Sequence, residues 1–168
     1  MATLAPGAYT APVTSTDGGT GMALVEAYEL DMAATARLKN LSTRARVATG
    51  AGVAIPGLVI TGENARTVLV RAVGPGLAAF GIGSTLARPS LVVISGVRAV
   101  AANAGWESSP DPAAIAAAAI SAGAFPLQNG RADAALIATL PAGVWTIQVS
   151  GADGGSGVVL IEVYDLST

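Results

Sequence analysis

A glycine-rich turn carries the most specific chemical motif of the chain. Residues 74–79, GPGLAA, follow the predicted strand at 67–73 and match the pattern G-x-G-x-x-A, which binds pyrophosphate in dinucleotide folds. The surroundings do not fit that role, because Pro75 removes a backbone amide and neither a long helix nor an acid at the end of a next strand follows. We therefore expect these glycines to serve a turn and close strand packing.

Other side chains offer little catalytic chemistry. The chain has no histidine and no cysteine, which excludes a Ser-His-Asp triad, a thiolate nucleophile and metal sites built on those residues. A glycosidase needs only two carboxylates, but Glu107 with Asp111, or Glu162 with a loop acid, has the spacing of ordinary surface acids. Lys39 lies near Ser42 without a recognisable oxyanion site. We predict no catalytic residue, no enzyme activity and no tightly bound cofactor.

One loop gathers oxygen-bearing side chains around a tryptophan. Asn103, Glu107 and Asp111 flank Trp106 in the sequence. Calcium takes about six to eight oxygen ligands, so these three side chains would supply only part of a site. Calcium at residues 103–111 is left open, but the favoured interpretation is an exposed loop with Trp106 packed on the edge of a sandwich.

The composition restricts the partners of the protein. Of its 168 residues 12% are charged, about half the usual roughly 25%, and the net charge is -2. A weakly charged surface favours association with neighbouring molecules. The basic residues are scattered, which argues against nucleic-acid binding. The uncharged stretches 72–87, 112–130 and 134–152 are interrupted by glycine and proline. We expect no nucleic-acid partner and no membrane span.

The two ends of the chain are copies of one another. Residues 2–30 align with residues 138–166 without a gap, at an offset of 136, and 14 of the 29 positions are identical. The chain therefore contains one full repeat and a second copy of its last part, as if cut from a tandem array. We predict two parts, an N-terminal hairpin at 1–32 that duplicates the C-terminal hairpin, and a β-sandwich repeat module at 37–168.

Each copy predicts a β-hairpin. The strands are expected at 8–13 and 22–30 in the first copy and at 144–150 and 158–166 in the second, joined by an Asp-Gly-Gly turn. In the last strand the alternation places Val159, Ile161 and Val163 toward the core. Glu162 then lies on a half-exposed face, solvated or paired with an arginine, and we expect Ile161→Ala to destabilise the protein more than Glu162→Ala.

The region between the copies is rich in short predicted strands. They lie at 37–46, 53–60, 66–73, 91–94, 97–102 and 132–140, and a helix begins after the N-cap Asp111 with Pro112 and ends at Gly123. This pattern indicates a mainly β protein, a β-sandwich or jelly-roll-like module with one short helix. Arg71, inside an apolar strand, is expected to pair with a carboxylate. The predicted core comprises Leu58, Ile60, Val68, Val70, Leu91, Val93, Leu136, Val149, Val159, Ile161 and Val163.

Five segments carry a family resemblance: RLKNLSTR at 37–44, TVLVRAVGP at 67–75, GAFPL at 123–127, DAAL at 133–136 and EVYD at 162–165. Together they resemble a tandem repeat of large secreted or surface proteins of environmental bacteria such as Verrucomicrobia. The resemblance implies an exported, non-enzymatic β-rich module. Residues 140–149 are also similar to the end of pre-peptidase C-terminal domains, which are β-sandwiches.

Two functions follow from these observations. The first is an extracellular or cell-surface structural repeat that self-associates head to tail with other copies, because the surplus hairpin must pack on its own chain or add strands to a neighbour. The alternative is a carbohydrate-binding or adhesion module for surface or matrix glycans, with Trp106, Trp145 or tyrosines as stacking platforms. The predicted assembly interface consists of Tyr9, Val13, Leu24, Tyr28, Trp145, Val149, Leu160 and Tyr164.

Overall fold

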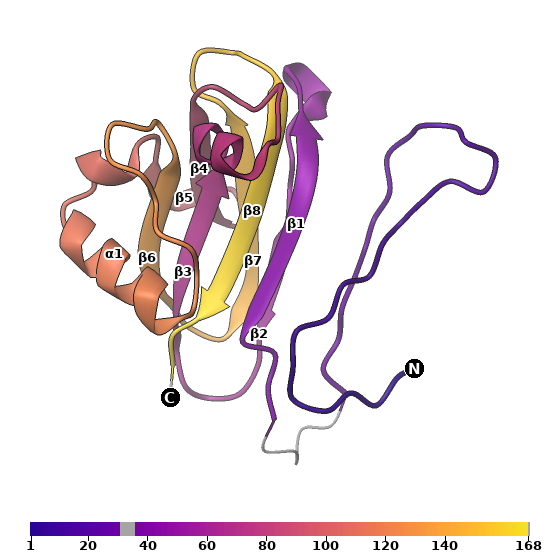
Figure 1. Cartoon of the computed structure of the whole chain (residues 1–168). Coiled ribbons are helices and arrows are strands. Elements are labelled where there is room, and N and C mark those ends of the chain that lie inside the picture. The colour runs from indigo at the N-terminus through magenta and orange to yellow at the C-terminus, as the bar shows by residue number, and fades with distance from the viewer. Residues whose placement is uncertain (31–35, 168) are drawn as a thin grey trace. The chain divides into compact units, whose positions relative to one another are not determined.

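The computed structural model describes residues 1–30 and 36–167. The chain divides into two units, Met1–Leu38 and Lys39–Thr168, and the larger unit contains the assigned strands and helices (Figure 1). The strands are β1 (Asn40–Val47), β2 (Gly57–Ile60), β3 (Arg66–Val73), β4 (Pro89–Ser95), β5 (Arg98–Asn103), β6 (Ala134–Leu140), β7 (Gly143–Gly151) and β8 (Gly157–Asp165). The helices are α1 (Pro112–Ser121) and the 3-10 turns η1 (Gly50–Gly52), η2 (Pro75–Phe80) and η3 (Trp106–Ser108).

The strands form two antiparallel four-stranded sheets. Their orders are β1-β8-β3-β6 and β2-β7-β4-β5. The pairs β1 with β8, β2 with β7, β3 with β6 and β4 with β5 are those of one long antiparallel ribbon, which rolls up so that β8 also pairs with β3 and β7 with β4. This is the strand order of a jelly roll. The predicted fold class, mainly β with one short helix, is confirmed.

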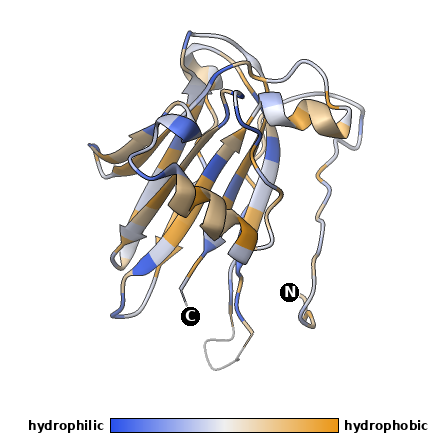
Figure 2. Cartoon of the chain, turned by 60° about the vertical axis from the view of Figure 1, so that its left-hand side comes forward, coloured by the Kyte–Doolittle hydropathy of each residue, from blue (hydrophilic) through white to orange (hydrophobic). Residues whose placement is uncertain are grey.

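The main core lies between the two sheets and follows the alternation along the strands. Val159 and Ile161 of β8 face it, and banding by hydropathy is visible along the strands (Figure 2). All the predicted core residues belong to this core, with Leu58 and Val163 half-buried at its margin. The strand predicted at 53–60 is shorter than expected, because Pro56 has no N–H to continue the ladder.

The helix covers the outer face of the first sheet and creates a second core. Asp111 caps α1 by accepting a hydrogen bond from the N–H of Ala114 at 2.8 Å, and Gly123, with φ of 72°, ends it as predicted. The buried residues of the second core are Leu69, Trp106, Ile115, Ala119, Ala124, Ala135 and Tyr164. The expectation that Glu162 is half-exposed is therefore wrong, because α1 and the chain after it bury this face.

The C-terminal copy is not a hairpin. Strand β7 pairs with β2 and β4, and β8 pairs with β1 and β3, so the turn after β7 carries the chain from one sheet to the other. We call residues 138–166 the closing segment, because it supplies an inner strand to both sheets. Both strands were predicted from the sequence, but they were expected to pair with each other. The alternation of apolar residues does not distinguish a hairpin from two strands in different sheets.

The N-terminal copy, residues 2–30, forms no strand. The hairpin predicted at 1–32 is not observed in residues 1–30, and residues 31 and 32 lie outside the described part of the chain. The corresponding strands β7 and β8 take their hydrogen bonds from β1 to β4 and not from each other. The local turn is nevertheless kept: Asp17 Oδ1 accepts from the N–H of Gly19 at 3.0 Å, as Asp153 Oδ1 accepts from Gly155 at 2.9 Å. Local chemistry thus repeats in the two copies, whereas strand pairing does not.

Candidate functional site

The glycine-rich turn binds a carboxylate of its own chain. Asp133 Oδ1 accepts hydrogen bonds from the N–H groups of Gly74 at 2.8 Å and Gly76 at 3.1 Å, and the Asp133 side chain is fully buried. An oxygen of the Asp133 side chain therefore accepts the two turn amides that a phosphate would accept in a dinucleotide motif. Asp133 could not be predicted as the partner of the turn, since the two lie 57 residues or more apart in the chain.

Burial dominates the acidity of Asp133. Desolvation raises the pKa of its carboxyl above 3.8, and the two glycine amides, Arg71 and Arg131 only partly oppose this shift. The folded chain therefore binds more protons than the unfolded chain between 3.8 and the raised pKa. Stability contributed by this group is present at low pH and falls as pH rises through that window.

Replacing Asp133 with asparagine tests this assignment. The variant keeps an oxygen for the two amides and does not titrate, so the difference in free energy of unfolding, wild type minus Asp133→Asn, is expected to decrease as pH rises and then to level off. Urea unfolding from about pH 4 to about pH 8 measures this difference. A difference that is constant or increases with pH would contradict burial as the main cause.

A second buried cluster joins β3, β8 and the loop after α1. Arg71 and Glu162 stand opposite each other in register, with Arg71 Nε 3.0 Å from Glu162 Oε2. Arg71 Nη1 also donates to the carbonyl of Phe125 at 2.8 Å, and its guanidinium lies 4.4 Å from the centre of the Phe125 ring. The prediction that Arg71 pairs with a carboxylate is confirmed. Sequence reasoning did not find Phe125, which has no local signal.

Tyr164 completes this cluster. Its hydroxyl donates to Glu162 Oε1 at 2.7 Å. Burial, followed by the hydrogen bond and the charge of Glu162, raises the pKa of Tyr164, so the phenol remains a hydrogen-bond donor at neutral pH. Each of the two oxygens of Glu162 thus has a buried partner, and the cluster attaches the loop at Phe125 to the sheet rather than presenting an acid to solvent.

The three candidate calcium ligands are each engaged with a different part of the backbone. Asn103 Oδ1 accepts from the N–H groups of Gly105 and Ala135 at 3.0 and 3.1 Å, and Glu107 Oε2 accepts from Gly130 at 2.8 Å. Asp111 caps α1. Among residues 1–30 and 36–167, no group of three or more acids is placed to hold a metal ion. Asn103 and Glu107 thus connect loops that are distant in sequence, whereas Asp111 serves its own helix.

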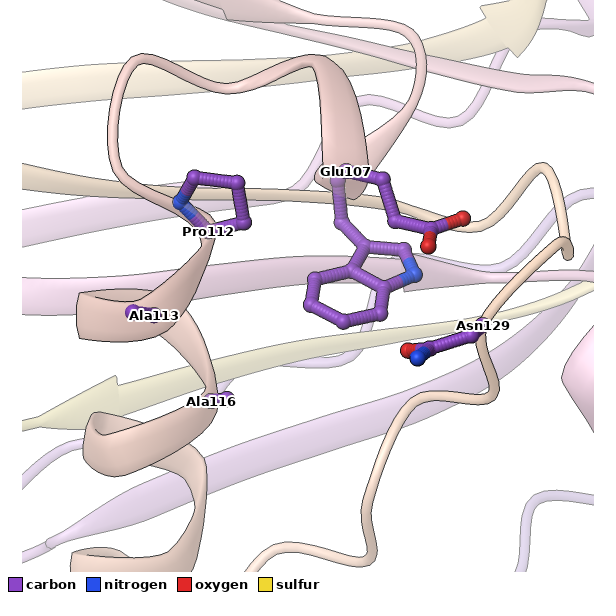
Figure 3. Close-up of a pocket in the computed structure, with 6 residues that line it drawn as sticks. Glu107, Pro112, Ala113, Ala116 and Asn129 are labelled. Carbon is purple, nitrogen blue, oxygen red and sulfur yellow. The ribbon is translucent and has the colours of Figure 1, made fainter.

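Trp106 lines a hollow of about 300 Å³ beside α1. The hollow lies between Pro112, Ala113 and Ala116 on one side and Glu107 and Asn129 on the other (Figure 3). Trp106 is only 6% exposed. Its ring is therefore not free to stack on a sugar. Its indole Nε1 has no hydrogen-bond partner.

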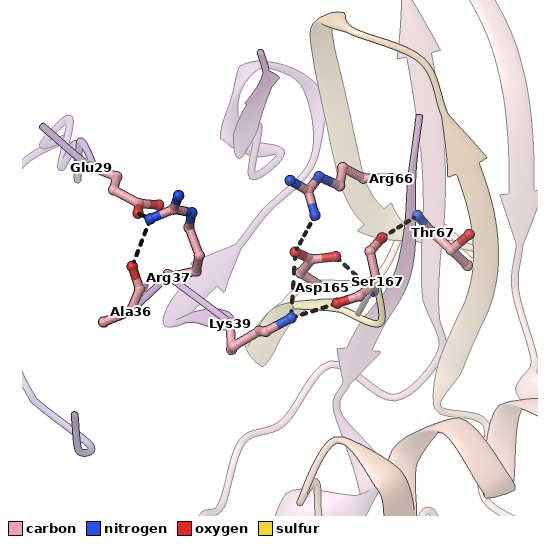
Figure 4. A network of polar contacts seen from close by, with 8 residues as sticks. All are labelled: Glu29, Ala36, Arg37, Lys39, Arg66, Thr67, Asp165 and Ser167. Atoms are coloured by element: carbon pink, nitrogen blue, oxygen red, sulfur yellow. Dashed lines mark hydrogen bonds and ion pairs between the residues drawn. The ribbon is translucent and has the colours of Figure 1, made fainter. Parts of the chain in front are cut away.

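Polar contacts fix the start of β1 beside the end of β8 (Figure 4). Lys39 Nζ donates to the carbonyl of Ser167 at 2.6 Å and lies 3.9 Å from Asp165 Oδ2, which is also 3.7 Å from Arg66 Nη1. The Thr67 N–H donates to Ser167 Oγ at 3.0 Å. The module thus begins and ends at one pole. Lys39 contacts Ser167 and Asp165 at this pole, and no contact of Lys39 with Ser42 is observed.

The predicted assembly residues fall into two groups. Tyr9, Val13, Leu24 and Tyr28 of the N-terminal copy are exposed, whereas Trp145, Val149 and Tyr164 of the closing segment are buried in the module itself and Leu160 is half-buried. Trp145, Val149 and Tyr164 can meet another chain only if the closing segment leaves its place. As folded, the exposed part of the predicted interface is the N-terminal copy.

Comparison with solved structures shows a likeness to the pre-peptidase C-terminal domain of a collagenase from Bacillus anthracis. The identity is 12% and the TM-score 0.44, over 74% of this chain and 89% of that chain. No family model and no curated protein matches the sequence. Within the described ranges, no helix has the length and apolar character to cross a membrane. The fold assignment therefore rests on the strand order of the chain itself.

Proposed function

We propose that the protein is a non-catalytic, extracellular structural module of a tandem array, which associates head to tail with modules of its own kind, including other copies of itself, through its terminal segments. The N-terminal copy is the observation that carries this proposal. Its sequence duplicates two inner strands of a jelly roll, yet its apolar side chains lie in solvent, with Leu24 84% and Tyr28 70% exposed. Exposed apolar surface of this kind favours protein–protein contact.

The side chains that could do chemistry are engaged in structural contacts, which supports a structural role. The glycine turn, the Arg71–Glu162 pair and the acids near Trp106 are all used to hold strands and loops together. The resemblance to repeats of secreted and surface proteins supports the extracellular location, and the low charge of the chain leaves little repulsion between modules.

Light scattering tests the association. We expect the mean mass of the intact chain to rise with protein concentration, because the N-terminal copy is exposed, and the mass of a chain that begins at Arg37 to remain that of a monomer. Monomers of both chains over the whole concentration range would contradict the proposal. Association of both chains would show that the N-terminal copy is not the contact.

A glycan-binding module is the second candidate. It is supported by the hollow beside α1, where the side chains of Glu107 and Asn129 supply polar groups. A glycan array with the intact chain distinguishes the two functions. Binding that is lost in Asn129→Ala, with unchanged light scattering, would favour the glycan function.

A further inference from the structure

We propose that residues 2–30 close a second jelly roll of different sequence, one that lacks its own closing segment, and that a complete copy of residues 39–168 is a poor acceptor for them. This inference rests on the proposed association and names its partner. A complete copy offers only sheet edges, since its own β7 and β8 occupy the two inner positions. The partner is thus a β-sandwich of this architecture with an open place in each sheet.

The N-terminal copy retains the features that define the place of a closing segment. Gly21 corresponds to Gly157, where a Cβ would lie 2.4 Å from the backbone of Leu86. The Asp17 turn has the same hydrogen bond as its counterpart. Tyr28 donates to Glu26 Oε1 at 2.9 Å, as Tyr164 does to Glu162. Retention of the glutamate indicates an acceptor with an arginine where this module has Arg71, because a buried carboxylate requires a cationic partner.

Other positions show that the copy does not fit this module. Three alanines of the N-terminal copy correspond to larger residues of the closing segment. Ala11 corresponds to Ile147 and Ala23 to Val159, both of which are fully buried. Ala27 corresponds to Val163. These replacements would leave cavities in the main core described above. An acceptor that packs well against residues 2–30 therefore has larger side chains opposite these alanines, which this module does not have.

A proline adds a hydrogen-bonding conflict. Pro12 corresponds to Gln148 of β7. The N–H groups of Ile147 and Val149 donate to the carbonyls of Pro56 and Ala54 beside β2, so the N–H between them faces β4, the other neighbour. Proline cannot make that bond. Residues 2–30 would therefore lose a ladder contact in this module as well as core volume.

The test gives the N-terminal copy the residues it lacks. In the full chain, Ala11→Ile, Pro12→Gln, Ala23→Val and Ala27→Val are combined, and the protein is refolded from urea at high concentration. We expect amides of residues 22–30 to become protected from exchange in up to about half of the molecules, a population that the wild type lacks, because each module has one place for β8 and the two copies now compete for it. Glu26→Ala added to this variant should remove the protection, since Arg71 then loses its carboxylate.

The outcomes separate this inference from the proposed function. Slow exchange at residues 22–30 in the refolded wild type would overturn it, because this module would then be an adequate acceptor. Fast exchange in the repaired variant would overturn it as well. Gln148→Pro in the full chain is a second measurement: it should lower the urea midpoint clearly, and an unchanged midpoint would remove the conflict at Pro12. Light scattering of the wild type tests the association separately, because contacts of the exposed apolar side chains of residues 2–30 with the outside of a complete copy raise the mean mass without any strand entering its sheets.

Discussion

Replacing Glu162 with alanine is expected to lower the free energy of unfolding by about 3–5 kcal/mol, because it leaves the fully buried Arg71 guanidinium without its ion-pair partner. The Tyr164 hydroxyl loses its acceptor in the same variant. Urea unfolding followed by the signal of the folded sheet measures the loss. The effect should rival that of Ile161→Ala, about 2–5 kcal/mol, although the sequence alone predicted a smaller loss at Glu162.

The duplicated sequence provides a matched control. Glu26→Ala removes the corresponding glutamate, which also accepts a tyrosine hydroxyl but lies in the exposed N-terminal copy. Its effect should remain within about 0.5 kcal/mol. In a double-mutant cycle, Arg71→Met combined with Glu162→Ala should cost less than the sum of the two single changes, since no buried charge is left unpaired. Equal losses for Glu26→Ala and Glu162→Ala would contradict the buried ion pair.

Features of the fold that depend on neighbours in sequence could be predicted. Asp111, Pro112 and Gly123 delimit α1 because capping uses backbone groups within one turn. The boundaries of β3 were predicted at 66–73, as observed, since an apolar run between turn residues is a local signal. The prediction that Ile161 lies on the core face of β8 was also correct.

Features that depend on distant segments could not be predicted. Nothing near Glu162 indicates that α1 covers its side of the sheet, and nothing near Gly74 indicates that Asp133 will accept its amide. The two copies make the limit explicit. The same Asp-Gly-Gly turn forms in both, but strands form only where β1 and β3, or β2 and β4, are available on either side. Strand formation is here a property of the acceptor sheets.

The largest steric effect is expected at Gly74. A Cβ at this position would lie 2.0 Å from the backbone oxygen of Leu86, and one at Gly157 would lie 2.4 Å from the Leu86 nitrogen. The chain at Leu86 passes directly against β3 and β8, with its N–H donating to the carbonyl of Val158 at 2.8 Å, and the Leu86 side chain is fully buried. Backbone on both sides leaves no flexible group that could give way.

Gly74→Ala should therefore reduce the free energy of unfolding by about 3 kcal/mol, the top of the usual range for overpacking. Gly83→Ala is the matched control, because a Cβ there meets nothing within 4 Å and the residue is exposed; its effect should lie within about 0.5 kcal/mol of zero. Urea unfolding of the three proteins gives the comparison. A Gly74→Ala variant as stable as Gly83→Ala would mean that Leu86 does not pass so close to β3, and that the glycine is needed only for its turn.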